Sequence, residues 1–340
     1  MSWRKFKELF GAGARAEHYF ILGIDIGNAT SSMSYFDLNQ ASAEIIDISG
    51  GYGKPSVPTV MQYINETKEW VFGEYAMAGR ANENDRVFGA LIERLGAGDY
   101  VEVAGRPLSV SAVLALYLKE LIGNCKNINP RAEIAGIVVS VPSYLSEEAR
   151  KDLAAVFQLA GYEKQLMGFW DDRECIFNRY YFDKPVKQET ALIIDFGARE
   201  IRGGVYEIAP GEDGARVDCQ SFLIEKNLGT DHIDKKVDGL FTALYAGHFG
   251  MTAEDIPPRQ KEQIDLFAYQ HKDMLFQKRL QSKPVKLYFN FAYPPFQETV
   301  TYDAIEKTIR PFRERFAAFI REILQKPTAS GKTLSAADID

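Results

Sequence analysis

Apolar positions follow two different periods along the chain, and their alternation predicts a fold that mixes strands with helices. Continuous or alternating apolar runs predict strands, which fall at residues 20–26, 32–38, 43–48, 58–64, 134–141, 191–196, 201–208, 216–225, 285–291 and 297–302. Helical spacing predicts helices from residue 74 onward, at 86–95, 109–122, 147–160, 231–248 and 259–280, and in a last segment that ends near 325. An apolar strand that feeds a helix, as at 134–160, is typical of a buried mixed or parallel sheet. The fold class is therefore α/β.

One pattern occurs twice. An apolar strand closed by Asp25-Ile26-Gly27, a tight turn and a second strand return at Asp195-Phe196-Gly197, 170 positions later (195 − 25 = 170). Both copies predict a hairpin, and the repeat predicts a duplicated lobe.

The turns of these hairpins indicate phosphate chemistry. A glycine-containing turn directs successive backbone N–H groups to one point, where phosphate oxygens bind. An aspartate just before the turn brings a carboxylate to the same place, and magnesium is often held through one or two carboxylates plus the substrate's phosphates. One such turn is weak support, because most are only turns, but two copies strengthen it. We expect Asp25 and Asp195 to converge on a magnesium ion that keeps its water shell.

Composition narrows the class of protein. The chain has 340 residues, 46% of them hydrophobic and 26% charged, which is typical of a globular protein with one large or two smaller cores. A net charge of −7 and a pI near 5.4 argue against nucleic acid as a partner. Three widely spaced cysteines support neither a disulfide framework nor a zinc site. With no apolar run of membrane-spanning length and no signal-peptide stretch, we expect a cytoplasmic protein without a membrane span.

The order of five segments resembles the nucleotide-binding domain of the heat-shock protein 70 (DnaK-type) chaperones. They are residues 23–27, 54–59, 138–150, 194–197 and 228–234. The resemblance runs from about residue 19 to 340 and implies a two-lobed, actin-like ATPase (ribonuclease H-like) fold, with duplicated mixed sheets flanked by helices around a central cleft. It implies an N-terminal extension (1–18), a first lobe (19–190, with a smaller subdomain at about 51–105) and a second lobe (191–340, with one at about 226–300).

The resemblance also implies a site between the lobes for ATP or ADP with magnesium. It places Asp25, Asp195 and Asp172 at the catalytic centre, the first two holding the metal through water. The residues it implies for cofactor binding are Gly27, Asn28, Ala29, Gly197, Ala198, Arg199, Gly229, Thr230 and Lys272.

Several positions depart from that family. Met77 takes the place of the catalytic lysine, and a thioether cannot stabilise a transferring phosphoryl group. Arg80, one helical turn further on, either reaches inward or is a solvated arginine. Glu200 and Arg202 replace a threonine and an aspartate after the second turn, which argues against the usual hydrolysis geometry. We expect hydrolysis to be weak or absent.

Four features stay open. Arg199 either binds phosphate directly or marks a lost site. Asp171 and Asp172 either stand behind metal-bound water or cap the helix that follows. Tyr269 either stacks on a base or belongs to the core. Residues 335–340 resemble the lead-in to the family's second adenosine motif, so the second lobe is expected to be incomplete at its C-terminal end.

Two functions follow. In one, the chain is a chaperone nucleotide-binding module that couples lobe closure to protein clients or co-chaperones. In the other, it is a nucleotide-independent scaffold that keeps the fold for protein–protein interaction. Fold alone does not decide between them.

Overall fold

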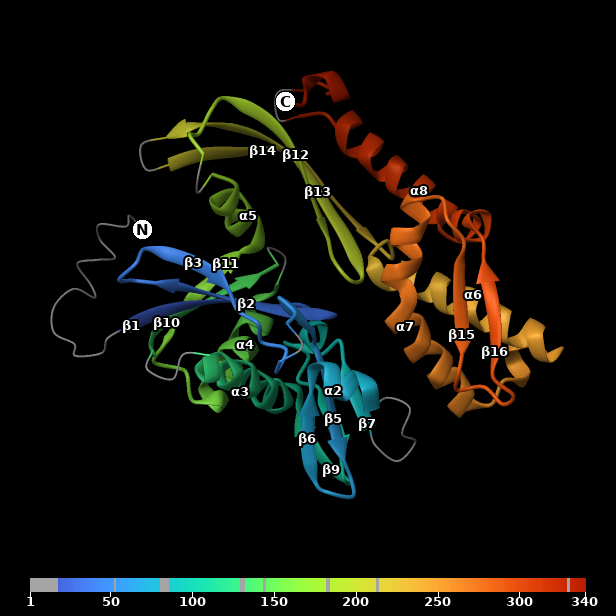
Figure 1. Ribbon diagram of the computed structural model, residues 1–340. Coiled ribbons are helices and arrows are strands. Elements are labelled where there is room, and N and C mark those ends of the chain that lie inside the picture. Colours follow the sequence, from blue (N-terminus) through green and yellow to red (C-terminus); the bar gives the residue numbers. More distant parts are fainter. Residues whose placement is uncertain are drawn as a thin grey trace. The chain divides into compact units, whose positions relative to one another are not determined.

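A computed structural model describes residues 18–51, 53–79, 86–128, 132–142, 145–181, 184–211, 214–328 and 331–340. The expected extension 1–18, apart from the backbone of His18, and Arg80 lie outside the described residues. The chain divides into two compact units, with the boundary between Pro185 and Val186. Sheets and helices occur in both units, as expected of an α/β protein (Figure 1).

The first unit contains a mixed sheet with the strand order β11-β10-β1-β2-β3, to which β4 is added beside β2. The strands are β1 (His18–Ile26), β2 (Thr30–Asp37), β3 (Ser42–Ile45), β4 (Ser56–Pro58), β10 (Ala132–Val141) and β11 (Leu166–Asp171). The strands β1, β10 and β11 are parallel, whereas β1, β2 and β3 form an antiparallel meander. The predicted mixed sheet is confirmed.

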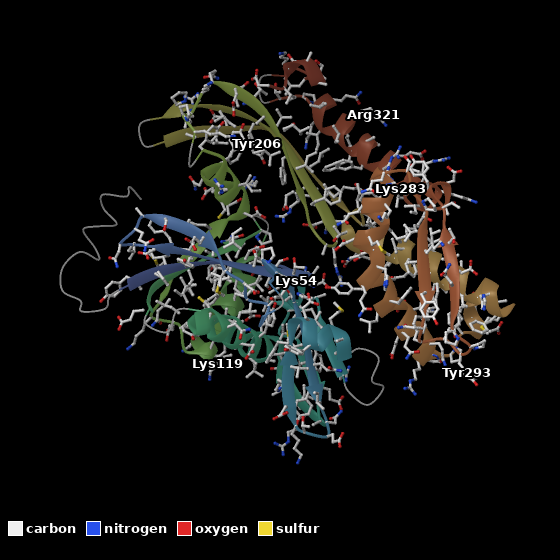
Figure 2. All side chains as sticks on the ribbon, viewed as in Figure 1. Lys54, Lys119, Tyr206, Lys283, Tyr293 and Arg321 are labelled. Atoms are coloured by element: carbon white, nitrogen blue, oxygen red, sulfur yellow. The ribbon has the colours of Figure 1, made fainter. Side chains whose placement is uncertain are left out.

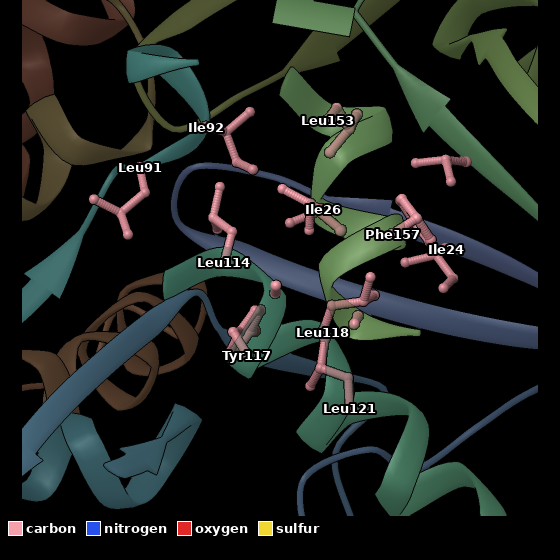
Figure 3. Close-up of a cluster of buried hydrophobic side chains, with 14 of the residues drawn as sticks. Ile24, Ile26, Leu91, Ile92, Leu114, Tyr117, Leu118, Leu121, Leu153 and Phe157 are labelled. Carbon is pink, nitrogen blue, oxygen red and sulfur yellow. The ribbon is translucent and has the colours of Figure 1, made fainter. Parts of the chain in front are cut away.

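Helices α3 (Val110–Ile128) and α4 (Glu147–Ala160) supply most of the helical side chains in the core of this unit. Alternate residues of β1, such as Ile24 and Ile26, point to the same side of the sheet and are buried. Figure 3 shows these two isoleucines among Leu118 of α3 and Phe157 of α4. This face is therefore the apolar core, and Asp25 lies on the opposite face of β1.

A smaller part of the first unit holds a three-stranded sheet of order β6-β5-β7 and a two-stranded sheet. Its elements are β5 (Val60–Ile64), β6 (Glu69–Phe72), α2 (Gly73–Ala78), β7 (Arg86–Gly89), the 3-10 turn η2 (Ile92–Arg94), β8 (Tyr100–Val103) and β9 (Arg106–Ser109). The helix predicted at 86–95 is wrong. Phe88 is buried on β7, and it pairs with Met61 of the neighbouring strand β5. Pairing between the strands therefore overrides the local helical spacing.

The second unit begins with an antiparallel meander of three long strands, β12 (Glu189–Phe196), β13 (Glu200–Gly211) and β14 (Gly214–Lys226). Helix α8 (Tyr302–Gln325) packs against β13 and β14. A Cβ at Gly203 would lie 2.6 Å from Ile323 Cδ1, so this glycine lets the helix approach the sheet closely. Phe319 and Ile323 fill the small core between them.

The remainder of the second unit has a separate, aromatic core. It is built by α6 (Thr230–Phe249), η3 (Ala253–Asp255), α7 (Pro258–Leu280) and the hairpin of β15 (Val285–Phe289) and β16 (Phe296–Val300). Phe289 and Phe296 stack across the hairpin, with ring centroids 4.5 Å apart. At its tip Tyr293 is 94% exposed (Figure 2). The stretch predicted as a terminal loop, 326–340, includes a short 3-10 turn, η4 (Ala336–Asp338).

Within the described ranges, no helix combines the length and the apolar character that crossing a bilayer requires.

Candidate phosphate-binding hairpins

The two predicted hairpins are present and share one backbone geometry. In the first, Gly27 N–H donates to Thr30 O at 3.0 Å, and in the second Gly197 N–H donates to Glu200 O at 3.0 Å. Asp25 pairs with Ser32, and Asp195 with Arg202, so both aspartates face the residue seven positions later. Each hairpin therefore has its aspartate in the same register, two residues before the glycine of the turn.

Glycine is required at the start of each turn by close approach, not by backbone angle. A Cβ at Gly27 would lie 2.8 Å from Thr30 O, and a Cβ at Gly197 would lie 3.0 Å from Glu200 O. Both contacts are with backbone atoms, which cannot swing away. The turns are compact because these two positions carry no side chain.

In the first unit, Asp25 lies at the carboxyl end of β1, beside the ends of β10 and β11. Ser140 Oγ donates a hydrogen bond to Asp25 Oδ1 at 3.1 Å, and Asp171 ends the next strand. Ligands of α/β proteins bind at this edge of the sheet, outside the carboxyl ends of the parallel strands. The topology thus brings the first glycine turn and two acidic positions to one edge.

The first turn is held by neighbours on both sides. Asn28 Oδ1 accepts from the Glu93 amide at 3.1 Å, and Ala29 O accepts from the Thr59 amide at 2.8 Å. Asn28 therefore uses its side-chain oxygen to fix the turn against η2. Backbone amides, rather than this side chain, are the groups expected to meet phosphate.

The acidic pair at the start of α5 (Asp172–Tyr181) separates into two roles. Asp171 accepts from the Arg173 amide at 2.9 Å and from its guanidinium at 2.9 and 2.7 Å. These hydrogen bonds from Arg173 lower the pKa of the Asp171 carboxyl. The capping interpretation therefore holds for Asp171, and the site role of Asp172 stays a prediction.

Cys175, which sequence reasoning did not single out for the site, marks where these acids gather. Burial raises the pKa of the Cys175 thiol to about 11, and the charges of Asp172 and Asp25 add to that shift. Both carboxylates thus act on one thiol, so Asp25 and Asp172 lie in the same neighbourhood. Its position one turn after Asp172 on α5 is the sequence signal that could have found it. Over the described ranges, no group of three or more His, Cys, Asp or Glu side chains is arranged to hold a metal directly.

The second hairpin carries a charge pair that the first lacks at the same position. Arg202 Nη2 lies 2.5 Å from Asp195 Oδ2, and Arg202 Nε lies 3.7 Å from Glu200 Oε1. The Arg202 side chain is only 12% exposed and that of Asp195 is 32% exposed. A guanidinium stays charged at any pH that a protein tolerates, so Arg202 keeps a positive charge beside the Asp195 carboxylate.

This pair bears on the expected magnesium ion. A hydrated metal fits Asp25, whose neighbours Ser32 and Ser140 are neutral hydroxyl residues. It does not fit Asp195, whose carboxylate already holds a cation. The convergence of both aspartates on one ion stays a prediction, and Arg202 argues against the part given to Asp195.

The second turn is joined to the start of α6. The amide of Thr230 donates to Gly197 O at 3.0 Å, and that of Asp231 donates to Ala198 O at 2.8 Å. A Cβ at Gly229 would lie 2.1 Å from Ala198 O, so only glycine fits there. The predicted residues of the second turn and of the start of α6 therefore lie in contact. The amides of Thr230 and Asp231, which could otherwise bind an anion at the helix N-terminus, donate to the turn instead.

Arg199 extends from this turn with a half-exposed side chain. Its Nε lies 3.8 Å from Asp231 Oδ2. Burial raises the pKa of the Asp231 carboxyl, and the charge of Arg199 opposes that shift. Arg199 is thus half exposed at the surface, where an anion can reach its guanidinium.

Lys272 and Met77 serve structural contacts. Lys272 Nζ lies 2.6 Å from Asp234 Oδ2, and 5.1 Å from the ring centroid of Tyr269. This ion pair ties α7 to α6, and Tyr269 borders the ammonium. Met77 is 8% exposed on α2, so its thioether is part of the interior of the first unit.

Comparisons with known proteins give partial matches to one family profile and to curated chaperones. The profile of a family described as "Family of unknown function (DUF5716) C-terminal" matches residues 43–203. The chain is 22% identical over 220 residues to the chaperone protein DnaK of Thermosipho africanus, covering 64% of this chain and 35% of that protein. It is also 22% identical over 219 residues to DnaK of Thermotoga maritima, with the same coverage. The chain therefore spans about a third of the length of these relatives, to which it is distantly similar.

Proposed function

We propose that the chain is a nucleotide-binding module of the heat-shock protein 70 type, which takes ATP or ADP at its two glycine turns. The observation that carries the proposal is the repeated geometry of the hairpins, each with a Gly N–H bond across the turn and an aspartate in the same register. The distant similarity to DnaK supports the same function. An actin-like, two-lobed arrangement and a cytoplasmic setting belong to this proposal.

The phosphates would meet other backbone amides of the two turns, because those of Gly27 and Gly197 donate within the turns, and Arg199 would be the nearby exposed cation. Magnesium, when bound, would lower the negative charge of the phosphates, and Asp25 with Ser140 behind it would hold the ion through water. Asp172 shares the neighbourhood of Asp25 and would orient that water. Closure of the lobes around the nucleotide would then be coupled to the binding of protein clients or co-chaperones.

Hydrolysis in this proposal is slow or absent. Met77 is buried and uncharged where a lysine would be needed, and Arg202 holds the second aspartate. Such a module would work as a switch controlled by binding, because the nucleotide stabilises the conformation of the chain to which the nucleotide binds.

The test is thermal denaturation of the chain with ATP, ADP or inorganic phosphate, followed by a phosphate-release assay. We expect nucleotide to stabilise the folded state by about 2.7 kcal/mol at a hundredfold excess over the dissociation constant. Phosphate release should stay at background. Asp25→Asn should weaken binding of magnesium–ADP by about tenfold, since it removes the carboxylate behind the metal's water.

Asp218→Asn is the matched control, because Asp218 lies on β14 in an exposed pair with Arg216. If no nucleotide stabilises the chain, the binding proposal is wrong. The same result would favour a nucleotide-independent scaffold, for which the specific support is that the second turn already takes up the amides of Thr230 and Asp231.

A further inference from the structure

We propose that Arg202 takes the place of a divalent cation at Asp195, so that the second hairpin accepts nucleotide phosphates without metal. The inference rests on the proposed nucleotide-binding function and specifies the form of ligand: at this hairpin it is the metal-free polyphosphate. It concerns the charge balance of one hairpin, which lies wholly within the second unit.

The geometry is that of a fixed internal counter-ion. Arg202 and Asp195 are direct partners across β12 and β13, and their charged atoms lie 2.5 Å apart. Glu200, two residues before Arg202 on the same strand, approaches its Nε at 3.7 Å. The guanidinium is nearly buried between two carboxylates, and it has no neutral form at accessible pH.

The first hairpin provides an internal comparison. Its backbone has the same register and the same turn bond, but Ser32 stands where the second has Arg202. The groups beside Asp25 in the register are the hydroxyls of Ser32 and Ser140, which bring no charge. At one position of a repeated frame, the first hairpin therefore has a neutral hydroxyl and the second has a cation.

Electrostatics then oppose a metal at Asp195. Magnesium approaches a carboxylate with its water shell largely intact, so it relies on attraction to that negative charge. A guanidinium at the same carboxylate cancels the attraction and repels the ion. Arg199, half exposed in the same turn, gives the hairpin a second positive group for phosphate oxygens.

The first arm of the test measures metal binding without nucleotide. Manganese is titrated into the full chain and followed by electron paramagnetic resonance. The proteins compared are wild type, Asp195→Asn, Arg202→Ser and the double variant Arg202→Ser with Asp195→Asn. We expect Arg202→Ser to gain a manganese site that the double variant loses. A wild-type manganese site abolished by Asp195→Asn would overturn the inference, and so would the lack of any gain in Arg202→Ser.

The second arm measures the affinity for a fluorescent ADP analogue with magnesium and with a chelator. Both are measured in the Asp25→Asn background, so that a metal at the first hairpin does not contribute. With Arg202 present we expect the two dissociation constants to agree within about threefold, whereas for Arg202→Ser removal of magnesium should weaken binding by about tenfold or more. Arg202→Lys, which keeps the charge, should behave like wild type. Arg216→Ser, which removes an exposed arginine of the same sheet, is the control.

The outcomes separate the two proposals. In the Asp25→Asn background, an affinity that falls tenfold or more in chelator would refute the role of Arg202 and leave nucleotide binding intact. Lack of ADP binding under both conditions would refute the proposed function, and the manganese arm would still decide whether Arg202 excludes a metal. If Arg202→Ser does not fold, as circular dichroism would show, the comparison of Asp25→Asn with and without magnesium and the behaviour of Arg202→Lys decide the question.

Discussion

Gly229 lies against the backbone of Ala198, so close that a Cβ at 229 would be 2.1 Å from the Ala198 carbonyl oxygen. This contact joins the first residue before α6 to the second glycine turn, and Asp231 N–H reinforces it by donating to the same oxygen. The turn and the helix therefore behave as one element of the second unit.

Gly229→Ala should destabilise the second unit by about 1–3 kcal/mol, because the new methyl group meets backbone atoms that have to move. The measurement is urea denaturation of the full chain. Gly239→Ala is the control, since that glycine lies within α6 and its added Cβ has open space. The control should gain about 0.5–1 kcal/mol from helix propensity. Equal effects at both positions would show that the close contact is absent.

Cys175 should react slowly with alkylating reagents. With a pKa of about 11, roughly one Cys175 thiol in a thousand is thiolate at pH 8, and the thiolate is the reactive form. Its alkylation rate, followed by mass spectrometry of peptides, should keep rising up to pH 11, with the exposed Cys219 as internal reference. Asp25→Asn and Asp172→Asn should each speed the reaction, because each removes a negative charge that raises this pKa. Unchanged alkylation rates would show that neither aspartate acts on the Cys175 thiol.

Asp171→Ala should cost the first unit about 0.5–2 kcal/mol at neutral pH, through loss of the cap on α5 and of the pair with Arg173. The folded pKa of Asp171 is lowered, so its stabilisation is present above the ordinary carboxyl pKa near 4 and is lost as the pH falls through the folded value. The difference between variant and wild type should therefore shrink in acid. Denaturant titrations across that range check it. Lys151→Ala, in an exposed pair on α4, should change stability by less than about 0.5 kcal/mol.

Met77→Lys should destabilise the first unit by about 2–4 kcal/mol, because it places an ammonium in the buried position of a thioether. ATP turnover should stay at background. Met77→Leu keeps the volume and should cost less than about 1.5 kcal/mol. A gain in phosphate release by Met77→Lys would contradict the buried place of residue 77 and would show that the rest of the site is competent.

Both glycine hairpins and most of the longer strands could be predicted from the sequence, because apolar periodicity and the Asp-x-Gly turn are local signals. The strands β6, β8, β9 and β11 were not predicted. The turn also fixes which residues of the two strands are opposite each other, seven positions apart at the aspartate. The Asp195–Arg202 contact could therefore have been predicted by counting residues from the turn. The strand at β7 was not, since its helical spacing is overruled by pairing with β5. Nor could local signals divide Asp171 from Asp172, because the side chain of Arg173 decides which acid caps α5.

The parallel pairing of β1 with β10 has a consequence for biosynthesis. Ser140 bonds to Asp25 although 115 positions separate them, so the first hairpin leaves the ribosome well before the strand that completes its sheet. A nascent chain that ends before Ala132 lacks every β10 partner of β1, so this edge of β1 is open and Leu22 and Ile24, which the finished unit buries, lack their full cover. The sheet of the first unit is therefore completed only late in the synthesis of this unit.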